Sequence, residues 1–230
     1  MYKRQDLSVF YDAHKDLFSI GWDSAARQMS GSHYDMLMSE ARMTSFFAIA
    51  CGQVPARHWG ALSRAMSRDG LHAGPLSWTG TMFEYYMPEL LLRSVRGSIG
   101  YEALSYCLHC QKKRIWHEKI PWGVSESGIY SFDYNLNYQY SPNGVQRLAL
   151  KRGMNDTLVI SPYASFLALP RDPAGALLNL DRLKKLGAYG RYGFYEAIDF
   201  TPERTGGRHP MLVKSYMAHH LGMSVTARCV

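Results

Sequence analysis

The chain has 230 residues, of which 47% are hydrophobic and 20% are charged, a composition that indicates one medium-sized globular domain and excludes disorder for the bulk of it. Its 26 Lys and Arg against 19 Asp and Glu give a net charge of +7, but the basic residues are dispersed, so nucleic acid is not an expected partner. No apolar run is long enough for a membrane span or a signal peptide, and we expect these residues to form a soluble domain without membrane contact.

Four cysteines, Cys51, Cys107, Cys110 and Cys229, are too few for a disulfide framework in a chain of this length, and reduced thiols are expected. Cys107 and Cys110 have the spacing of half a zinc site, but no second pair follows at a suitable distance. No Gly-rich phosphate loop or metalloprotease pattern occurs either. We therefore expect neither a metal nor another cofactor.

Most of the chain is predicted to be helical, beginning with a short amphipathic element from Asp6 to Ile20. A first strong helix is predicted to follow the capping-box spacing of Ser32 and Asp35 and to run to about Cys51. Because it is apolar on nearly every side, we expect it to be buried among other helices. Further helices are expected at 55–68, 81–96 with a kink at Pro88, 100–117, 161–169, 173–186 and 211–224. Buried helices joined by long Gly-rich loops indicate an all-helical barrel or bundle with its site on the loops.

Residues 130–140 form a tract in which aromatic or apolar residues alternate with polar ones. Period two predicts an extended ribbon with one aromatic face and one amide-rich face. Flat rings can stack on a pyranose and amides can bond its hydroxyls, so the ribbon is a candidate wall of a sugar cleft. A half-buried edge strand with its aromatic side in the core is an equally good interpretation.

Two glutamates stand out as candidate catalytic residues. Glu126 lies beside Trp122 in a loop of Pro, Gly and Ser residues, a polar setting that would keep its carboxylate ionised. Glu40 is expected on the same helical stripe as Met36 and Phe47, where burial would raise its pKa as a general acid requires. An ionised carboxylate with a protonated partner is the division of labour in glycoside cleavage. The alternatives are a structural ion pair for Glu40 and a solvated loop residue for Glu126.

Other polar residues have structural explanations that are at least as good. Asp35 and Glu84 occupy capping-box positions, and Glu196 closes a turn equally well. His219 and His220 are adjacent on a predicted helix, about 100° apart, so they do not easily hold one metal. Packing or hydrogen bonding is the favoured role of this pair.

Nine blocks of sequence stand in a characteristic order, and they are DLFSIGWD (16–23), YDMLMSEARMTSFF (34–47), VPARHW (54–59), LSWTGTMFEYYMP (76–88), PWGVSES (121–127), LKRG (150–153), SPYASFLAL (161–169), GFYEAIDFTP (193–202) and YMAHHLGMS (216–224). In this order they resemble the glycoamylase-like C-terminal domain of cyclic β-1,2-glucan synthases, whose relatives include endo-β-1,2-glucanases. Leu221 departs from the pattern, since the family usually has Gln there.

The resemblance implies an (α/α)6 toroid of inner and outer helices, all-α apart from the short aromatic ribbon, with the glycan across loops at one end. Residues 1–230 would be a single domain of this kind, incomplete and truncated at both ends. The resemblance also implies a bacterial protein that acts on β-1,2-glucan. It would be associated with the inner membrane where the remainder of a membrane-bound synthase chain accompanies it.

By the same resemblance, Glu40 would be the general acid/base and Glu126 the nucleophile of a retaining transglycosylase that cyclises linear β-1,2-glucan. Hydrolysis by an endo-β-1,2-glucanase and a non-catalytic glucan-binding fragment are the alternatives. The residues expected to contact the glucan are Trp22, Asp23, Asp35, Arg42, Trp78, Glu84, Trp122, Tyr130, Tyr134, Tyr138, Tyr195, Glu196, His219 and His220.

Overall fold

The computed structural model describes residues 5–207 and 209–229, and these contain eight α-helices and fourteen short strands in small antiparallel sheets. The prediction of an all-α (α/α)6 toroid is therefore wrong, because the fold is mixed. Two causes combine. Short apolar runs fit a strand as well as a helix by periodicity alone, and Pro88 ends the helix predicted over 81–96 at Tyr86.

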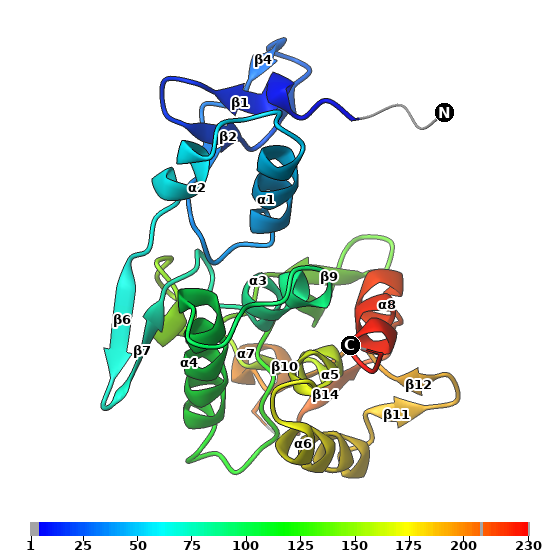
Figure 1. Cartoon of the computed structure of the whole chain (residues 1–230). Helices are drawn as coiled ribbons and strands as arrows, with labels where there is room; N and C mark the ends of the chain where they lie inside the picture. The colour runs from blue at the N-terminus through cyan, green and yellow to red at the C-terminus, as the bar shows by residue number, and fades with distance from the viewer. Residues whose placement is uncertain (1–4, 208, 230) are drawn as a thin grey trace.

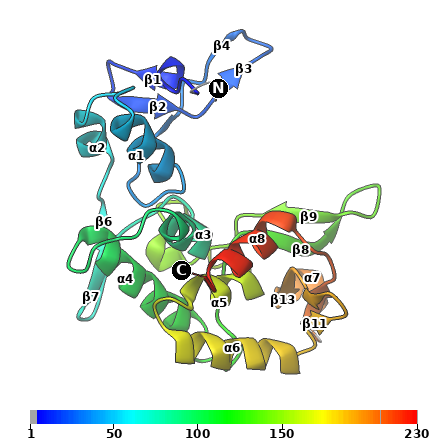
Figure 2. The ribbon, with the colours of Figure 1, turned by 45° about the vertical axis from the view of Figure 1, so that its right-hand side comes forward.

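Figures 1 and 2 show two unequal lobes, with the N-terminal lobe (residues 5–61) above and the C-terminal lobe (66–207 and 209–229) below. The upper lobe joins a three-stranded sheet of order β1-β2-β5 to a hairpin, β3-β4, and two helices. Its elements are η1 (Ser8–Phe10), β1 (Tyr11–Asp12), β2 (Leu17–Ser19), β3 (Trp22–Asp23), β4 (Gln28–Met29), β5 (His33–Tyr34), α1 (Arg42–Ala50) and α2 (Arg57–Ala61).

Helix α1 is shorter and more exposed than its composition predicts. It begins only at Arg42, because the preceding segment is drawn into a bridge with Ser63 and Leu37 and Met38 are buried in the main core. Phe46 and Phe47 are 48% and 52% exposed, so the helix is not buried on all sides.

The C-terminal lobe contains most of the helices. Its elements are β6 (Met66–Asp69), β7 (His72–Pro75), α3 (Met82–Tyr86), η2 (Met87–Leu90), α4 (Ile99–Arg114), β8 (Ser127–Phe132), β9 (Tyr138–Ser141), η3 (Gln146–Leu148), β10 (Val159–Ile160), α5 (Pro162–Ala168), α6 (Pro173–Lys185), β11 (Tyr189–Gly190), β12 (Gly193–Phe194), β13 (Ala197–Asp199), α7 (Pro202–Thr205), β14 (Met211–Val213) and α8 (Ala218–Thr226). Helices α4, α5 and α6 agree with the predicted ranges.

Local signals account for two further details of this lobe. The predicted capping box is present, since Thr81 and Glu84 exchange hydrogen bonds at the start of α3. Pro88 follows, and the chain changes there to the 3-10 turn η2 instead of restarting an α-helix. The aromatic ribbon is extended as predicted, but it folds back as the hairpin β8-β9, with Asp133 accepting backbone hydrogen bonds in the turn.

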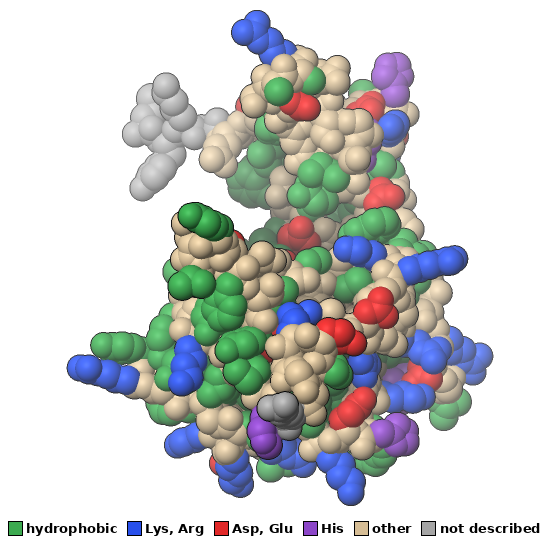
Figure 3. Space-filling model, turned by 180° about the vertical axis from the view of Figure 1, so that it is seen from behind, with side chains coloured by type: hydrophobic (Ala, Val, Ile, Leu, Met, Phe, Trp, Pro, Cys, Tyr) green, Lys and Arg blue, Asp and Glu red, His purple; other side chains and the backbone are tan. Residues whose placement is uncertain are grey.

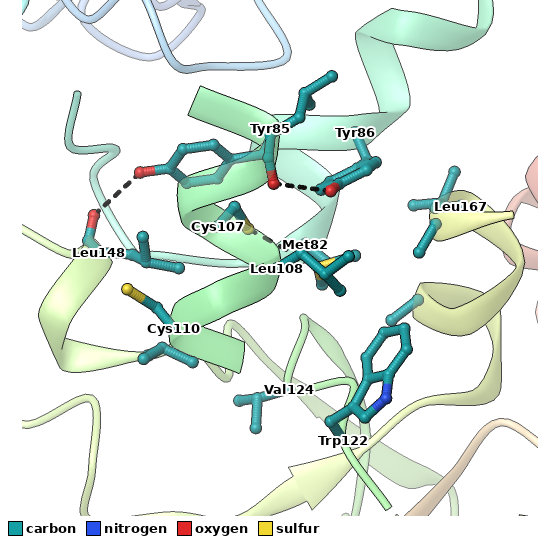
Figure 4. Packing of buried hydrophobic residues seen from close by; sticks show 14 of the residues in the cluster. Met82, Tyr85, Tyr86, Cys107, Leu108, Cys110, Trp122, Val124, Leu148 and Leu167 are labelled. Carbon is teal, nitrogen blue, oxygen red and sulfur yellow. Dashed lines mark hydrogen bonds between the residues drawn. The ribbon is translucent and has the colours of Figure 1, made fainter. Parts of the chain in front are cut away.

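The main hydrophobic core lies where α3, α4 and α5 meet (Figure 4). Met82, Tyr85 and Cys107 are fully buried there, and the Cys107 thiol lies 3.7 Å from the Met82 sulfur. Trp122 also belongs to this core and is only 4% exposed. Its indole therefore packs in the core, whereas the sequence-based prediction was that it contacts the glucan.

Arg42 links the two lobes. Its buried guanidinium donates to the carbonyl oxygens of Glu84 (2.8 Å) and Tyr85 (2.7 Å), and it lies 3.3 Å from the Glu89 carboxylate. These carbonyls belong to the last residues of α3, whose oxygens have no partner within the helix. Arg42 is therefore a structural residue that fixes α1 on α3, and its hydrogen-bonding groups face protein partners.

Candidate active site between the two lobes

A cavity of about 570 Å³ opens between the lobes, where Figure 3 shows the molecule hollowed below the N-terminal lobe. Its walls are formed by residues of both lobes: Ile20, Ser32, His33, Tyr34, Asp35, Met36, Ser39, Glu40, Trp78, Thr79, Glu84, Glu126 and Pro142. A neighbouring cavity of about 360 Å³ shares Ile20, Tyr34 and Glu40 with it and is mostly apolar. The two glutamates singled out by the sequence thus line one continuous groove, one from each lobe.

Glu126 is half-buried, in the loop that leads into β8. Burial is the main reason that its pKa rises from 4.5 to about 7, and the charges of Glu40 and Glu84 raise it further. A hydrogen bond from Tyr140 acts in the opposite direction. Small polar residues surround Glu126 in the sequence, but Ser125 and Ser127 are themselves buried, so the expected ionising environment is absent.

Glu40 lies in the turn just before α1, and so it is not on the helical stripe that the sequence suggested. It is half-buried and accepts a hydrogen bond from the Ser39 hydroxyl (3.1 Å). Its charge helps to raise the pKa of Glu126, and also that of Tyr34 after the larger effect of burial.

Glu84 is buried and its carboxylate is fully occupied. Its oxygens accept hydrogen bonds from the Ser77 hydroxyl and from the backbone N–H and hydroxyl groups of both Thr79 and Thr81, at 2.8–3.0 Å. These bonds hold the loop that carries Trp78, which lines the cavity and is 58% exposed. An accessible indole on a held loop is suited to stacking on a sugar ring.

Several residues predicted to contact the glucan lie elsewhere. Trp22 and Asp23 are exposed on the hairpin β3-β4, where Asp23 accepts N–H groups of its own turn. Tyr130 and Tyr138 pack on the small core of Val159, Ala197 and Val213, and Tyr134 is 98% exposed at the tip of β8-β9. None of these five aromatic or acidic residues is among those that line the interlobe cavity, whereas Asp35 is.

Tyr195, Glu196 and His220 line a separate cavity of about 460 Å³ beside α8. Glu196 is buried and its Oε1 lies 2.9 Å from Nδ1 of His220. His219 is exposed as a residue and is not among the lining residues. Partial burial of its ring and the charge of His220 lower its pKa, while Glu196 opposes this. The two histidines therefore have different surroundings, as their angular separation predicts.

Two residues near Glu40 were not predicted from the sequence. Tyr34 and Ser39 line the cavity and belong to the same sequence block, 34–47, as Glu40. Their closeness to Glu40 in the sequence is the only signal that could have indicated them. Tyr140, the last aromatic of the ribbon that the sequence predicted as a wall of the cleft, contacts Glu126. Burial and the Glu126 charge raise the pKa of Tyr140.

Within residues 5–207 and 209–229, no group of three or more His, Cys, Asp or Glu side chains could hold a metal ion. In the same part of the chain, no helix combines the length and the apolar character needed to cross a membrane.

Two carboxylates on a groove with an exposed indole are the arrangement found in enzymes that cleave glycosidic bonds. Residues 32–227 match the Glycoamylase family, described as putative glucoamylase, and the chain belongs to that family. It is 43% identical over 223 residues to the cyclic beta-(1,2)-glucan synthase NdvB of Rhizobium meliloti, covering 96% of this chain and 8% of that protein. The family resemblance predicted from the nine sequence blocks is thereby confirmed.

Solved structures share the fold. An endo-beta-1,2-glucanase from Chitinophaga pinensis, in complex with sophorotriose and glucose, matches with a TM-score of 0.65 and 17% identity over 96% of this chain and 55% of that one. A putative glucoamylase from Bacteroides fragilis matches with a TM-score of 0.64 and 17% identity over 97% and 54%. The chain therefore spans about half the length of these structures.

Proposed function

We propose that this chain is the glucan-binding and catalytic part of an enzyme that cleaves and rejoins β-1,2-glucan, cyclising the linear polymer. The observation that carries the proposal is that Glu40 and Glu126 line one groove from opposite lobes and interact electrostatically. The 43% identity to a cyclic beta-(1,2)-glucan synthase supports the choice of polymer. Trp78 provides a ring on which a pyranose can stack.

In the proposed retaining mechanism, the Glu126 carboxylate attacks the anomeric carbon while Glu40 gives its proton to the leaving oxygen. The Glu40 carboxylate then takes the proton of a sugar hydroxyl at the other end of the chain, and that oxygen displaces Glu126 to close the ring. Transfer exceeds hydrolysis when the acceptor hydroxyl is held in place and water is kept out. If water enters instead, the same pair hydrolyses the polymer and releases linear products.

The pKa of Glu126 favours a second assignment of roles. With a pKa of about 7, Glu126 holds its proton over more of the acidic range than an ordinary carboxyl and could serve as the proton donor, with Glu40 in the other catalytic role. The pH dependence of kcat/KM separates the two assignments. A kcat/KM that increases as the pH rises through 7 supports Glu126 as the nucleophile. A kcat/KM that decreases over the same pH range supports Glu126 as the acid.

We also infer that these residues are one part of a larger glycoamylase domain within a longer synthase associated with the inner membrane. The chain spans 8% of its curated relative, which supports a longer native context. Fractionation of cells that express the natural gene tests this inference: a product that remains in the soluble fraction would contradict it.

The experiment that tests the activity compares the purified chain with Glu40→Gln and Glu126→Gln variants on linear β-1,2-glucan. We expect rings without new reducing ends from the parent chain, and loss of at least a hundredfold in both variants. Glu118→Gln, which alters a surface glutamate paired with Arg114, is the matched control and should retain full activity. Linear fragments with new reducing ends would identify a glucanase, and no turnover by a folded chain would identify a non-catalytic binding fragment.

A further inference from the structure

The loop that carries Glu126 is held by a buried tyrosine outside the groove. Tyr163 is on α5, and its hydroxyl donates a hydrogen bond to Ser125 Oγ (2.7 Å). The same hydroxyl oxygen lies 3.0 Å from the carbonyl oxygen of Glu126. Ser125 Oγ in turn accepts the backbone N–H of Phe83 at the start of α3 (3.1 Å). One hydroxyl network therefore ties the loop to two helices at the residue next to Glu126.

A second set of contacts supports the same tyrosine from behind. The ring of His220 lies parallel to that of Tyr163, with centroids 3.8 Å apart at 16°, and its Nδ1 lies 2.9 Å from Glu196 Oε1. The same Glu196 oxygen accepts the N–H of Gly128, two residues after Glu126 (3.2 Å). Tyr140, which contacts the Glu126 carboxyl, lies 6.2 Å from the His220 ring.

The packing leaves little room for this loop to move. A Cβ at Gly128 would lie 3.3 Å from Glu196 Cγ and 3.1 Å from Val213, so strand β8 packs closely against the Glu196 side chain. Glu196 and His220 are 5% and 2% exposed. Buried hydrogen-bond partners of this kind fix a neighbouring backbone because displacement would break the bonds that pair its polar groups.

We propose that Tyr163 is a positioning residue that sets the place of Glu126 in the groove, and that the buried pair of Glu196 and His220 supports it. This inference rests on the proposed function, because it takes Glu126 to be a catalytic carboxylate. It assigns Glu196 and His220 a supporting role in place of contact with the glucan. A carboxylate displaced by about 1 Å can lose as much as a hundredfold in rate, so a hydroxyl that holds its backbone affects catalysis without touching substrate.

The groups that face Glu126 come from four elements, and they determine what a displacement would do. Glu40 and Glu84 raise its pKa by their charges, Tyr140 lowers it by a hydrogen bond, and Tyr163 holds its backbone. Burial has the largest effect on this pKa. A loop released from Tyr163 would admit water to the carboxyl, and its pKa would fall toward the ordinary value.

The test is an NMR titration of the chain with ¹³C-labelled glutamate side chains, in which the Glu126 carboxyl signal is assigned by its loss in Glu126→Gln. Tyr163→Phe keeps the stacked ring and removes only the hydroxyl. We expect its Glu126 midpoint to fall by about one pH unit, and kcat on β-1,2-glucan to fall about tenfold with KM little changed. Tyr86→Phe is the matched control, since it removes a buried hydroxyl that donates to the Leu104 carbonyl (2.7 Å), and it should leave the midpoint unchanged.

An unchanged Glu126 midpoint in Tyr163→Phe would overturn the proposal, whether or not the chain turns over glucan. If that variant does not fold, Ser125→Ala removes the other partner of the same hydroxyl, and the same criterion applies to it. Absence of turnover by the parent chain would contradict the proposed function alone, because the titration reads the position of Glu126 without substrate.

Discussion

The two lobes each supply one glutamate to the groove, but they differ in what holds them together. The N-terminal lobe has its own small core of Phe18, Ala48 and Val54, and its helix α1 exposes two phenylalanines. The C-terminal lobe is built around a large continuous core in which α3, α4 and α5 meet. Burial of apolar surface is the main stabilising contribution to folding. The lobe that carries Glu40 therefore has the smaller stabilising core.

Glu40 is nevertheless fixed, because its two flanks are anchored in the other lobe. Leu37 and Met38, just before it, are buried in the main core, and Arg42, just after it, bonds to the end of α3. The groove therefore owes its geometry to three residues of the N-terminal lobe that pack on the C-terminal lobe. A site between unequal lobes can be well ordered when the segment that carries one of its residues also links the lobes.

The largest expected effect comes from breaking that link. Arg42→Ala removes the side-chain donor of the Glu84 and Tyr85 carbonyl oxygens and the ion pair with Glu89, and we expect it to cost ~3 kcal/mol of unfolding free energy. Urea unfolding followed by circular dichroism measures this loss. Arg64→Ala is the matched control, since its guanidinium donates to carbonyl oxygens close to it in the sequence, such as that of Trp59 (2.7 Å), and does not link the two lobes. An equal loss in the two variants would contradict the special role of Arg42.

The next effect concerns the charge of Glu126. Its pKa is raised from 4.5 in the unfolded chain to about 7 in the fold, so folding favours the protonated form. That stabilising contribution is complete below pH 4.5 and is lost as the pH rises through 7. We expect Glu126→Gln to resemble the parent chain at pH 4 and to be more stable by up to ~2–3 kcal/mol at pH 8. Urea titrations at the two pH values provide the measurement, and a difference independent of pH would refute the assigned burial.

The cores themselves can be compared with one substitution made in each lobe. Val145→Ala opens a cavity in the large core and should cost ~2 kcal/mol, whereas Val54→Ala in the small core should cost ~1 kcal/mol because its surroundings can collapse. Native-state hydrogen exchange adds a second measurement, in which amides of α1 should open before those of α4. Similar losses of unfolding free energy in the two variants, with α1 and α4 amides exchanging together, would mean that the two lobes unfold as one unit.

The smallest expected effect is on glucan binding at the exposed face of the groove. Trp78→Ala removes an indole that lines the cavity and should raise KM about tenfold with unchanged stability. Trp116→Ala, at a position that is 74% exposed and is not among the cavity-lining residues, is the control and should leave KM unchanged. Equal KM values for the two variants would mean that Trp78 does not contribute to glucan binding.

Much of the local structure was predictable from the sequence. The capping box at Thr81 and Glu84 specifies the start of α3 through groups three residues apart, and helices α4, α5 and α6 follow from apolar periodicity with Gly and Pro at their ends. The aromatic alternation predicted an extended segment, although its reversal at Asp133 was missed. The nine blocks also predicted the family that the comparison confirmed.

Only the tertiary structure decided the fold class, the groove and the state of the two glutamates. Residues 32–41 have a composition suited to a helix, yet contacts with Ser63 and the main core hold them as the short strand β5, a bridge and a turn. Likewise, the polar sequence around Glu126 predicted an ionised carboxylate, but distant residues bury the loop and raise its pKa. Local sequence determines hydrogen bonds between near neighbours. Burial and charge interactions instead depend on residues that are distant in the sequence, such as Glu40 and Glu126, which are 86 positions apart.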